Sequence, residues 1–342
     1  MAADAATGDR DRHIVLVAPP GEWVRGEMPR RWLAAHGLDV ALLPHPSPQF
    51  SASSAMEALE ARAAGPPCTW HFYPFPHDQY LIDTLQARGH RVLIGIDDDY
   101  WHTSPWHPRG PHLDSLLSLE RLLTAADGLV VTTLPIRNIV TRFNPDVSVV
   151  PNGVDLAVMP PPPSPRPGRA TRVGWSGWTG HHGDTAILEA PMRALFAGDP
   201  QVTFVVAGET PLWATTEPRV ERDPRLMPPL VHYRRLARLG LDVFVVPLAE
   251  HPWNESRSML KALETAALGI PMIVSDVGPY REMPDDVTLK VPNTASAWRV
   301  ALERLIAGPS LRTTLAQRAR RWVREHHTIE ATGPQWQKAL AL

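Results

Sequence analysis

The sequence predicts an α/β protein with two doubly wound parallel sheets, and three observations indicate this fold class. Strand-like apolar runs alternate with helical segments between residues 13 and 152. The same alternation restarts at residue 171 and continues to residue 327. Between the two series lies "MPPPPSPRPGRA", whose prolines cannot sit inside a helix or a sheet. Because strands that alternate with helices of this length build parallel sheets, each series predicts one Rossmann-like domain.

The first series starts with "HIVLVAP" (13–19), a buried strand, followed by a helix that ends at Gly37. Further strands are expected at residues 38–44, 68–75, 90–96, 129–133 and 147–151. Further helices are expected at residues 77–89 and 113–128, with a short one before the last strand. This order predicts a sheet whose helices lie in the crossover connections.

The second series has the same design. Strands are expected at residues 171–177, 202–208, 241–248 and 271–276. Helices are expected at residues 184–197, 230–240, 256–268, 294–307 and 309–326, with a short helix after Gly333.

The chain is therefore expected to divide into five parts. These are a flexible tail (1–12), a first domain (13–152), a linker (153–170), a second domain (171–327) and a C-terminal segment (328–342). Ligands of such sheets bind at the carboxyl ends of the strands, so the cleft between the two domains is the expected site.

Composition narrows the function classes. The formal net charge of -2 does not indicate a polyanionic partner for the whole chain, although basic residues cluster at residues 317–327. The single cysteine, Cys68, excludes a disulfide framework and a multi-cysteine metal site. No apolar run reaches the length of a membrane span, and residues 1–13 lack the apolar core of a signal peptide. We therefore expect a cytoplasmic protein without a transmembrane segment, of unknown oligomeric state.

Two loops of the second domain carry glycines where a ligand is expected. "GWSGWTGHHGD" (174–184) follows a strand and opens a helix, so its backbone can approach a ligand closely and the helix N-terminus favours an anion. "SDVGPY" (275–280) ends another strand and offers Gly278 and backbone N–H groups to a phosphate. A glycine-rich turn without a ligand is the alternative for the first loop.

The helix expected at residues 256–268 carries Arg257, Lys261 and Glu264 on one face. An exposed row of ion pairs would explain this spacing, at only about 0.2–0.5 kcal/mol per pair. However, the first half of this helix should line the cleft, because it follows a strand directly. A diphosphate needs positive charge, and a ribose needs a carboxylate that accepts hydrogen bonds from its hydroxyl groups. The pattern supplies both.

These stretches resemble GT-B-fold glycosyltransferases, close to the large retaining family that includes sugar-transferring enzymes of bacterial glycan assembly. The matching stretches are "VVPNGVD", "GWSGWTGHHGD" and "NESRSMLKALETAALGIPMIVSDVGPY". The chain is most similar to a retaining, family-four-like branch with the signature "DDD", G-x-x-x-H-x-x-D and N-x-x-[KR]-S-x-x-K-x-x-E. The resemblance covers most of residues 90–285, and it implies that the C-terminal helix returns to the first domain.

The resemblance also implies roles for individual residues. Glu264 matches the glutamate that holds the nucleotide ribose, and Arg257 and Lys261 match the basic positions near the donor diphosphate. The other matches in the donor-binding motifs are Gly177, Trp178, His181, Asp184, Asn254, Ser258 and Gly278. The chain departs from the pattern at Ser256, where the family usually has its first glutamate and where contacts to the donor sugar's hydroxyl groups are affected.

The sequence "DDDYWH" (97–102) follows a strand of the first domain. In relatives of this fold a polar residue near that strand end contacts the transferred sugar or the acceptor, so Asp97 or Asp98 is expected there. Three adjacent carboxylates also suit Mg²⁺, and one of them capping a turn is the structural alternative. GT-B enzymes typically need no metal, and we expect no cofactor besides the nucleoside-diphosphate sugar as donor.

The expected reaction is transfer of a glycosyl group to a hydroxyl acceptor with retention of anomeric configuration. The acceptor is either a glycan or lipid-linked glycan, or a hydroxymethylated base in phage-type DNA. A DNA acceptor needs a basic track, such as Arg234, Arg235 and Arg238 or the arginines at 318–324. A lipid-linked acceptor would place the protein at the membrane periphery. A nucleotide-sugar epimerase and a nucleotide-sugar-binding protein without turnover are the other functions left open on this fold.

Overall fold

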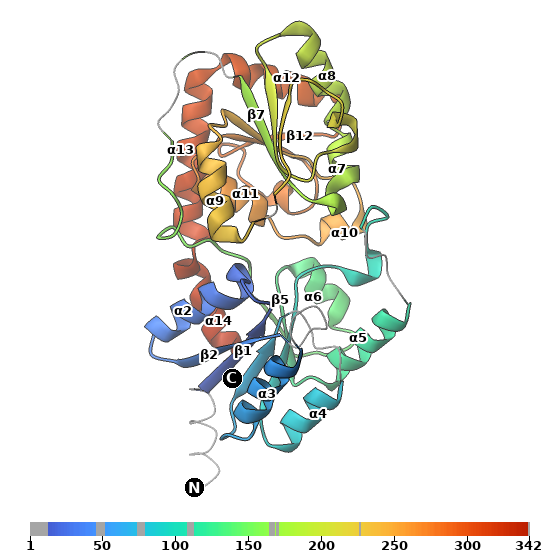
Figure 1. Cartoon of the computed structure of the whole chain (residues 1–342), viewed down its shortest axis with the longest axis vertical. Coiled ribbons are helices and arrows are strands. Elements are labelled where there is room, and N and C mark those ends of the chain that lie inside the picture. The colour runs from blue at the N-terminus through green and yellow to red at the C-terminus, as the bar shows by residue number, and fades with distance from the viewer. Residues whose placement is uncertain are drawn as a thin grey trace. The chain divides into compact units, whose positions relative to one another are not determined.

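The computed structural model describes residues 13–45, 52–73, 79–107, 113–163, 168, 171–225 and 227–340, in two compact units (Figure 1). The first unit contains the described residues up to Trp101, those between residue 113 and Gly153, and those from Ile329 onward. The second contains residues 102–107 and the described part of Val154–Thr328. The predicted N-terminal tail and residues 164–167, 169 and 170 of the predicted linker lie outside the described residues.

The first unit is built on a parallel six-stranded sheet in the order β2-β1-β3-β4-β5-β6. Its strands are β1 (His13–Ala18), β2 (Asp39–Pro44), β3 (Thr69–Phe72), β4 (Arg91–Ile96), β5 (Gly128–Val131) and β6 (Val147–Val149). Its helical elements are η1 (Trp23–Glu27), α2 (Met28–Ala35), α3 (Ala52–Ala63), α4 (Gln79–Ala87), α5 (Leu113–Ala125), α6 (Leu134–Val140) and α14 (Ile329–Leu340), with the short η2 (Tyr100–His102) after β4. The central strands are buried because helices cover both faces of the sheet.

Helix α14 packs against α2 within the first unit. The indole N–H of Trp32 donates to Glu330 Oε2 at 2.8 Å. The prediction of a short helix beginning after Gly333 was wrong, since α14 starts at Ile329 and continues through Gly333 and Pro334. Gly333 lies under the Trp32 indole, where a Cβ atom would overlap the ring, so the glycine allows close packing of the two helices.

The second unit has a parallel six-stranded sheet in the order β12-β11-β10-β7-β8-β9. Its strands are β7 (Arg172–Gly177), β8 (Thr203–Gly208), β9 (Val220–Asp223), β10 (Val243–Val246), β11 (Met272–Ser275) and β12 (Leu289–Val291). Its main helices are α7 (His182–Ala186), α8 (Glu189–Gly198), α9 (Pro229–Arg238), α10 (Pro252–Glu255), α11 (Leu260–Ala267), α12 (Ala295–Ala307) and α13 (Pro309–His326). The 3₁₀ helices of this unit are η3 (Thr179–His181), η4 (Leu212–Ala214) and η5 (Gly278–Glu282). The predicted α/β class with two parallel sheets is confirmed.

The elements that were not predicted include the strands β9 and β12 and the helix α3. β9 and β12 are short strands at the two edges of the sheet. Neither contains a long apolar run that would predict a strand, and in β9 only Val220 is buried. α3 buries Ala55, Leu59 and Ala63 at spacings of four residues, a helical period carried mostly by small side chains. The predicted helix at 184–197 is two helices, α7 and α8.

The parallel topology places the carboxyl ends of β7, β10 and β11 along one edge of the second sheet. The loops that follow these strands contain the predicted donor-binding motifs. Among the helices of the described residues, none combines the length and apolar character that crossing a membrane requires.

Candidate active site

The loop after β7 folds back so that His181 and Asp184 meet. His181 Nδ1 lies 2.8 Å from Asp184 Oδ2, and both side chains are buried. Gly177 lies against the Trp175 indole, and a Cβ atom at this position would overlap the ring. Glycine is therefore required at residue 177 by packing, independently of any ligand.

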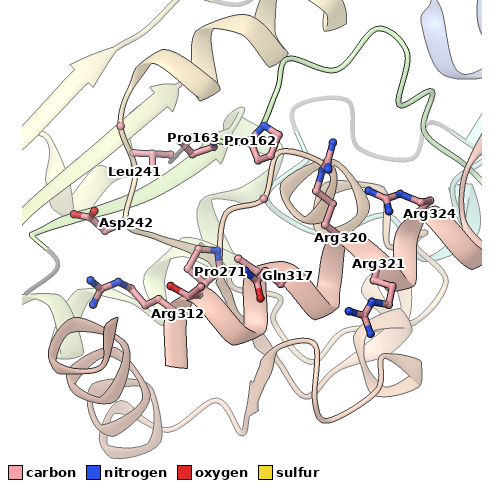
Figure 2. Close-up of a pocket in the computed structure, with 14 residues that line it drawn as sticks. Pro162, Pro163, Leu241, Asp242, Pro271, Arg312, Gln317, Arg320, Arg321 and Arg324 are labelled. Carbon is pink, nitrogen blue, oxygen red and sulfur yellow. The ribbon is translucent and has the colours of Figure 1, made fainter. Parts of the chain in front are cut away.

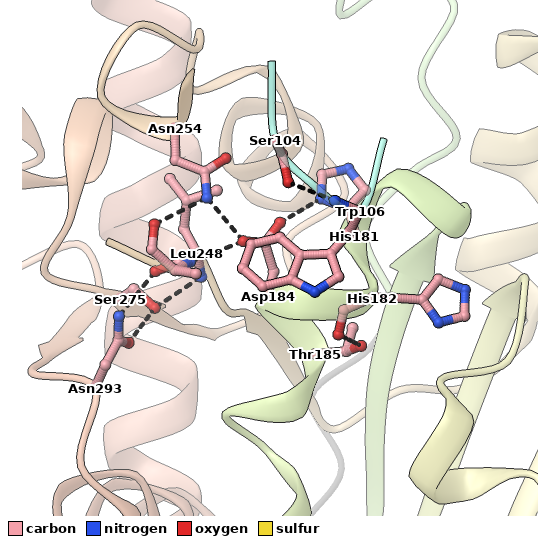
Figure 3. A network of polar contacts seen from close by, with 11 residues as sticks. Ser104, Trp106, His181, His182, Asp184, Thr185, Leu248, Asn254, Ser275 and Asn293 are labelled. Atoms are coloured by element: carbon pink, nitrogen blue, oxygen red, sulfur yellow. Dashed lines mark hydrogen bonds and ion pairs between the residues drawn. The ribbon is translucent and has the colours of Figure 1, made fainter. Parts of the chain in front are cut away.

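Asp184 is the centre of a buried hydrogen-bond network (Figure 3). Its Oδ1 accepts from the backbone N–H of Ala249 and from Asn254 Nδ2, each at 2.8 Å. Burial alone would raise the pKa of this carboxyl, but the hydrogen bonds from His181 and Ala249 hold the pKa below its ordinary value. An ionised carboxylate only accepts hydrogen bonds, so His181 Nδ1 carries a proton and donates it. His181 Nε2 is then the acceptor atom of the ring.

A second set of hydrogen bonds joins the ends of β10 and β11. Ser275 Oγ accepts from the N–H of Leu248 at 2.8 Å and donates to Asn293 Oδ1 at 2.7 Å. Asn293 Nδ2 returns a hydrogen bond to the Leu248 carbonyl at 2.9 Å. These bonds hold the backbone at Leu248, and the next residue, Ala249, donates its N–H to Asp184. Ser275 and Asn293 therefore help to position the Asp184 carboxylate, although both are far from it in the sequence.

Lys261 provides a cation beside this network. Its Nζ lies 5.4 Å from the centroid of the Trp175 ring. Burial of the ammonium group, together with the nearby charge of Arg257, lowers the pKa of Lys261 to about 8. Burial, and secondly the Lys261 charge, lowers the pKa of His181 to about 3, so this imidazole is neutral at physiological pH.

Arg257 occupies a different position from the one predicted. Helix α11 begins at Leu260, and Arg257 lies in the turn between α10 and α11, so it does not share a helix face with Lys261 and Glu264. Its guanidinium stacks over the Trp253 ring at 4.8 Å from the centroid. The helix predicted at 256–268 is α11, and its predicted start was wrong, because residues 256–259 form the turn that separates it from α10.

Glu264 lies one turn after Lys261 on α11. Its Oε1 accepts a hydrogen bond from the Tyr233 hydroxyl at 2.7 Å. Burial raises the pKa of Glu264 to about 7, although the bond from Tyr233 and the charge of Lys261 act in the opposite direction. Tyr233, on α9, was not predicted, because it lies 31 residues from Glu264 in the sequence and meets it only through the packing of two helices.

The remaining predicted donor residues lie around this centre. Gly278 has a φ of 55°, and a Cβ atom there would overlap the Asn254 carbonyl, so the glycine brings η5 close to α10. Ser258 is half-buried in the turn before α11. Ser256 is buried, and its hydroxyl donates to the Pro252 carbonyl at 3.4 Å, a bond that caps the short helix α10.

The segment at residues 102–107 belongs to the second unit, although the sequence placed it in the first domain. Its His107 ring lies between the rings of Trp178 and Trp253, at centroid distances of 5.2 and 5.0 Å. The Trp106 indole covers Gly183 so closely that a Cβ atom there would overlap it. These aromatic residues beside the donor loop were missed, because a loop segment without periodicity does not indicate its tertiary partners.

Asp97 and Asp98 belong to the first unit. Asp97 accepts hydrogen bonds from the Tyr73 hydroxyl at 2.5 Å and from the Tyr100 hydroxyl at 3.2 Å. Asp98 is half-buried beside it. Asp99, the third carboxylate, is buried and accepts from the Trp101 N–H at 3.1 Å, which is the turn-capping role considered above. Among the described residues, no group of three or more His, Cys, Asp or Glu side chains is arranged to hold a metal ion.

No protein-family model and no curated protein matches the chain. Solved structures do match along nearly its whole length. Sucrose-phosphate synthase from Thermosynechococcus elongatus is similar with a TM-score of 0.67 at 18% identity, covering 96% of this chain and 98% of that one. Anabaena HepE, solved with UDP and glucose, has a TM-score of 0.64 at 13% identity, covering 96% and 99%. A glycosyltransferase from Rickettsia africae has a TM-score of 0.64 at 10% identity, covering 95% and 97%.

The chain has the GT-B fold. At these identities the similarity shows the fold alone.

Proposed function

We propose that this protein transfers a glycosyl group from a nucleoside-diphosphate sugar to a hydroxyl acceptor, with retention of anomeric configuration. The observation that carries the proposal is the pairing of Lys261 and Glu264 on α11, both with shifted pKa values, next to the His181–Asp184 pair. The GT-B fold, in which HepE was solved with UDP-glucose, supports a nucleotide-sugar donor at these residues. The resemblance of the three motifs to the retaining family supports retention.

In this reaction the residues of the site must stabilise the diphosphate as it leaves the sugar. As the bond between the sugar carbon and the phosphate oxygen breaks, negative charge grows on the diphosphate. Lys261 and Arg257 supply positive charge near the donor loop, and the ring of Trp175 keeps water from one side of the Lys261 ammonium. Neutral His181 offers Nε2 as an acceptor for a hydroxyl group of the donor sugar. Glu264 offers its second carboxylate oxygen to the ribose.

A glycan hydroxyl is the acceptor that we favour over DNA. One predicted basic track contains Arg235, but its side chain is buried and donates to the Arg225 carbonyl at 2.6 Å. Arg235 also pairs with Asp223 at 2.6 Å. In the other predicted track, Arg318 pairs with Asp286 at 3.4 Å. In each track, at least one arginine is therefore engaged in contacts within the protein. This weakens the case that either track binds the phosphate backbone of DNA.

Product analysis tests the proposal. The full chain is incubated with UDP-glucose, then with other nucleoside-diphosphate sugars, in the presence of glycan or hydroxymethylated-DNA acceptors. A transferase releases nucleoside diphosphate and forms a glycosylated acceptor. Conversion of the donor into a different nucleotide sugar would identify an epimerase instead, and binding without any product would identify a binding protein.

Glu264→Gln is expected to weaken nucleoside-diphosphate affinity by about tenfold, because hydrogen bonds to a charged acceptor contribute roughly 1.5–3 kcal/mol. The neutral amide keeps the size of the side chain and can still accept from Tyr233. Isothermal titration of wild-type and variant protein with UDP measures the change. An unchanged affinity, with the variant folded, would exclude Glu264 from the ribose site. Glu255→Gln, which removes the carboxylate paired with Arg281 at 2.7 Å, is the matched control.

Nucleotide affinity is expected to be greatest between about pH 7 and about pH 8. Above the lowered pKa of Lys261, about 8, the ligand-free protein holds a neutral amine that must take up a proton before it attracts a diphosphate, so affinity falls as pH rises. Below the raised pKa of Glu264, about 7, its carboxyl is protonated and accepts hydrogen bonds poorly, so affinity falls as pH falls.

Titrations with UDP from about pH 6 to about pH 9 measure this profile. In Glu264→Gln the decrease at low pH should disappear while the decrease at high pH remains. A profile that is the same for the variant and the wild type would contradict the assignment of the lower limb to Glu264.

A further inference from the structure

A cavity of the second unit lies away from the donor motifs (Figure 2). Its volume is about 370 Å³. Leu241 and Asp242, which precede β10, and Pro271, which precedes β11, line its floor. The cavity therefore lies at the amino ends of these parallel strands, whereas the candidate active site lies at their carboxyl ends. It has room for a ligand of nucleotide size.

The linker forms an apolar wall of this cavity. Pro162 packs directly on Gly269, the residue that ends α11 with a φ of 70°. A Cβ atom at Gly269 would lie only 2.6 Å from Pro162 Cβ, so no larger residue allows the linker to lie there. Pro163, Pro271 and Leu241 continue this apolar surface.

Arginines of α13 form the opposite wall. Arg324 lies one helical turn from both Arg320 and Arg321, and all three residues line the cavity (Figure 2). Arg320 Nε donates to the Ala267 carbonyl at 3.1 Å, which fixes this side chain and leaves its terminal nitrogens for other partners. Within the part of the chain that the structure describes, Arg321 and Arg324 form neither a hydrogen bond nor an ion pair.

The charge of these arginines is not balanced by the rest of the lining. The acidic residue among the described lining residues is Asp242, and its Oδ2 accepts from the backbone N–H groups of Thr171 and Arg172, each at 3.0 Å. The fourth arginine, Arg312, has a structural role, since its guanidinium donates to backbone carbonyls, including that of Gly168 at 2.7 Å.

Several other exposed arginines of this unit are paired with carboxylates. Arg193 pairs with Glu189 at 3.1 Å, Arg281 with Glu255 at 2.7 Å, and Arg318, on the same helix α13, with Asp286 at 3.4 Å. Three uncompensated guanidinium groups around one concave, partly apolar surface repel one another, and an anion bound among them would relieve this repulsion.

We propose that this cavity is a binding site for a small phosphate-bearing molecule of nucleotide size. The phosphate contacts Arg320, Arg321 and Arg324, and the rest of the ligand packs against the prolines of the linker. A small ligand is favoured over a nucleic-acid chain because the arginines line a concavity bounded on one side by the linker, rather than an extended track. The site shares no residue with the donor site, so it does not depend on the proposed glycosyl transfer.

The test is a calorimetric titration of the full chain carrying Lys261→Ala, so that the candidate donor site contributes little. Inorganic pyrophosphate and adenosine monophosphate are the probes. We expect saturable binding of both, weakened about tenfold or more by adding Arg321→Ala and Arg324→Ala, because charge-assisted hydrogen bonds are lost. Both arginines are exposed and make no contact that holds the fold, so the variant should stay folded. Arg318→Ala, outside the cavity, should change the affinity less than about twofold.

Two results would overturn the proposal. One is the absence of saturable binding of either probe. The other is binding that the Arg321→Ala/Arg324→Ala pair leaves unchanged. A single-stranded oligonucleotide is titrated in parallel: if it binds through these arginines while adenosine monophosphate does not, the surface contacts nucleic acid and the small-ligand site is excluded.

Discussion

Lys261→Ala is expected to lower kcat by about 10²- to 10³-fold, because removing one preorganised electrostatic donor at a developing negative charge has typically cost that much. The ammonium group lies beside Trp175 in a partly desolvated position, where its charge acts more strongly than it would in water. The leaving diphosphate carries more negative charge in the transition state than in the bound donor. The loss should therefore be seen in kcat rather than only in KM.

Steady-state kinetics with the donor and acceptor identified by product analysis measure this effect. Lys338→Ala removes an exposed lysine of α14 in the first unit and is the matched control. Lys261→Arg keeps a cation and should retain part of the activity. If Lys261→Ala raised KM with kcat unchanged, Lys261 would contribute to donor binding alone. Thermal unfolding of each variant shows whether the fold is intact.

Asp184→Ala is expected to destabilise the protein by about 3–5 kcal/mol, because removing one partner from a buried charged network leaves the others uncompensated. The N–H of Ala249 and the ring N–H of His181 would lose their acceptor, and Asn254 would lose one of its two. The same change should abolish nucleotide binding, since the donor loop would lose its attachment to the end of β10.

Asp184→Asn should be much less destabilising than Asp184→Ala. The amide oxygen can accept from Ala249 and Asn254, and the amide NH₂ can donate to His181 Nδ1 once the imidazole proton moves to Nε2. The fold would then be kept while the atom offered to the donor sugar changes from an acceptor to a donor. We therefore expect a folded variant with strongly reduced activity.

Chemical denaturation of the two variants measures the difference. In the wild type, the stabilisation that the Asp184 carboxylate provides should also be lost at low pH. The folded-state pKa of Asp184 lies below its ordinary value, so the stabilisation is complete above that ordinary value and is lost as pH falls through the lower folded-state pKa. Asp184→Asn should lack this dependence. Equal stabilities of the Ala and Asn variants would show that the hydrogen bonds of Asp184 contribute nothing measurable.

The sequence predicted the helical positions of Lys261 and Glu264 better than it predicted their surroundings. Lys261 and Glu264 are adjacent on α11 because helical spacing is a local property, readable from the sequence. The prediction placed Arg257 on the same helix as Lys261, which was wrong because the ends of short helices depend on tertiary packing. Here Trp253 lies in the core and the chain turns before α11 starts.

The acid–base character of the site was not readable from the sequence. The raised pKa of Glu264 and the lowered pKa values of Lys261 and His181 arise from burial, which is produced by packing of α9, α11 and the loop after β7. The cavity with the α13 arginines has the same origin. A run of arginines in the sequence predicts a charged helix face, but only the position of the linker makes that face concave.

The sequence by itself determined the α/β class, the two series of strands and the glycine positions of the donor loops. These features depend on the period of apolar residues and on backbone freedom, which act over a few neighbouring residues. Tertiary structure decided which groups meet: Asp184 reaches Ala249 and Asn254, 65 and 70 residues away in the chain, and Tyr233 reaches Glu264. Such contacts are set by how the helices and strands pack, and packing depends on the whole core rather than on any one segment.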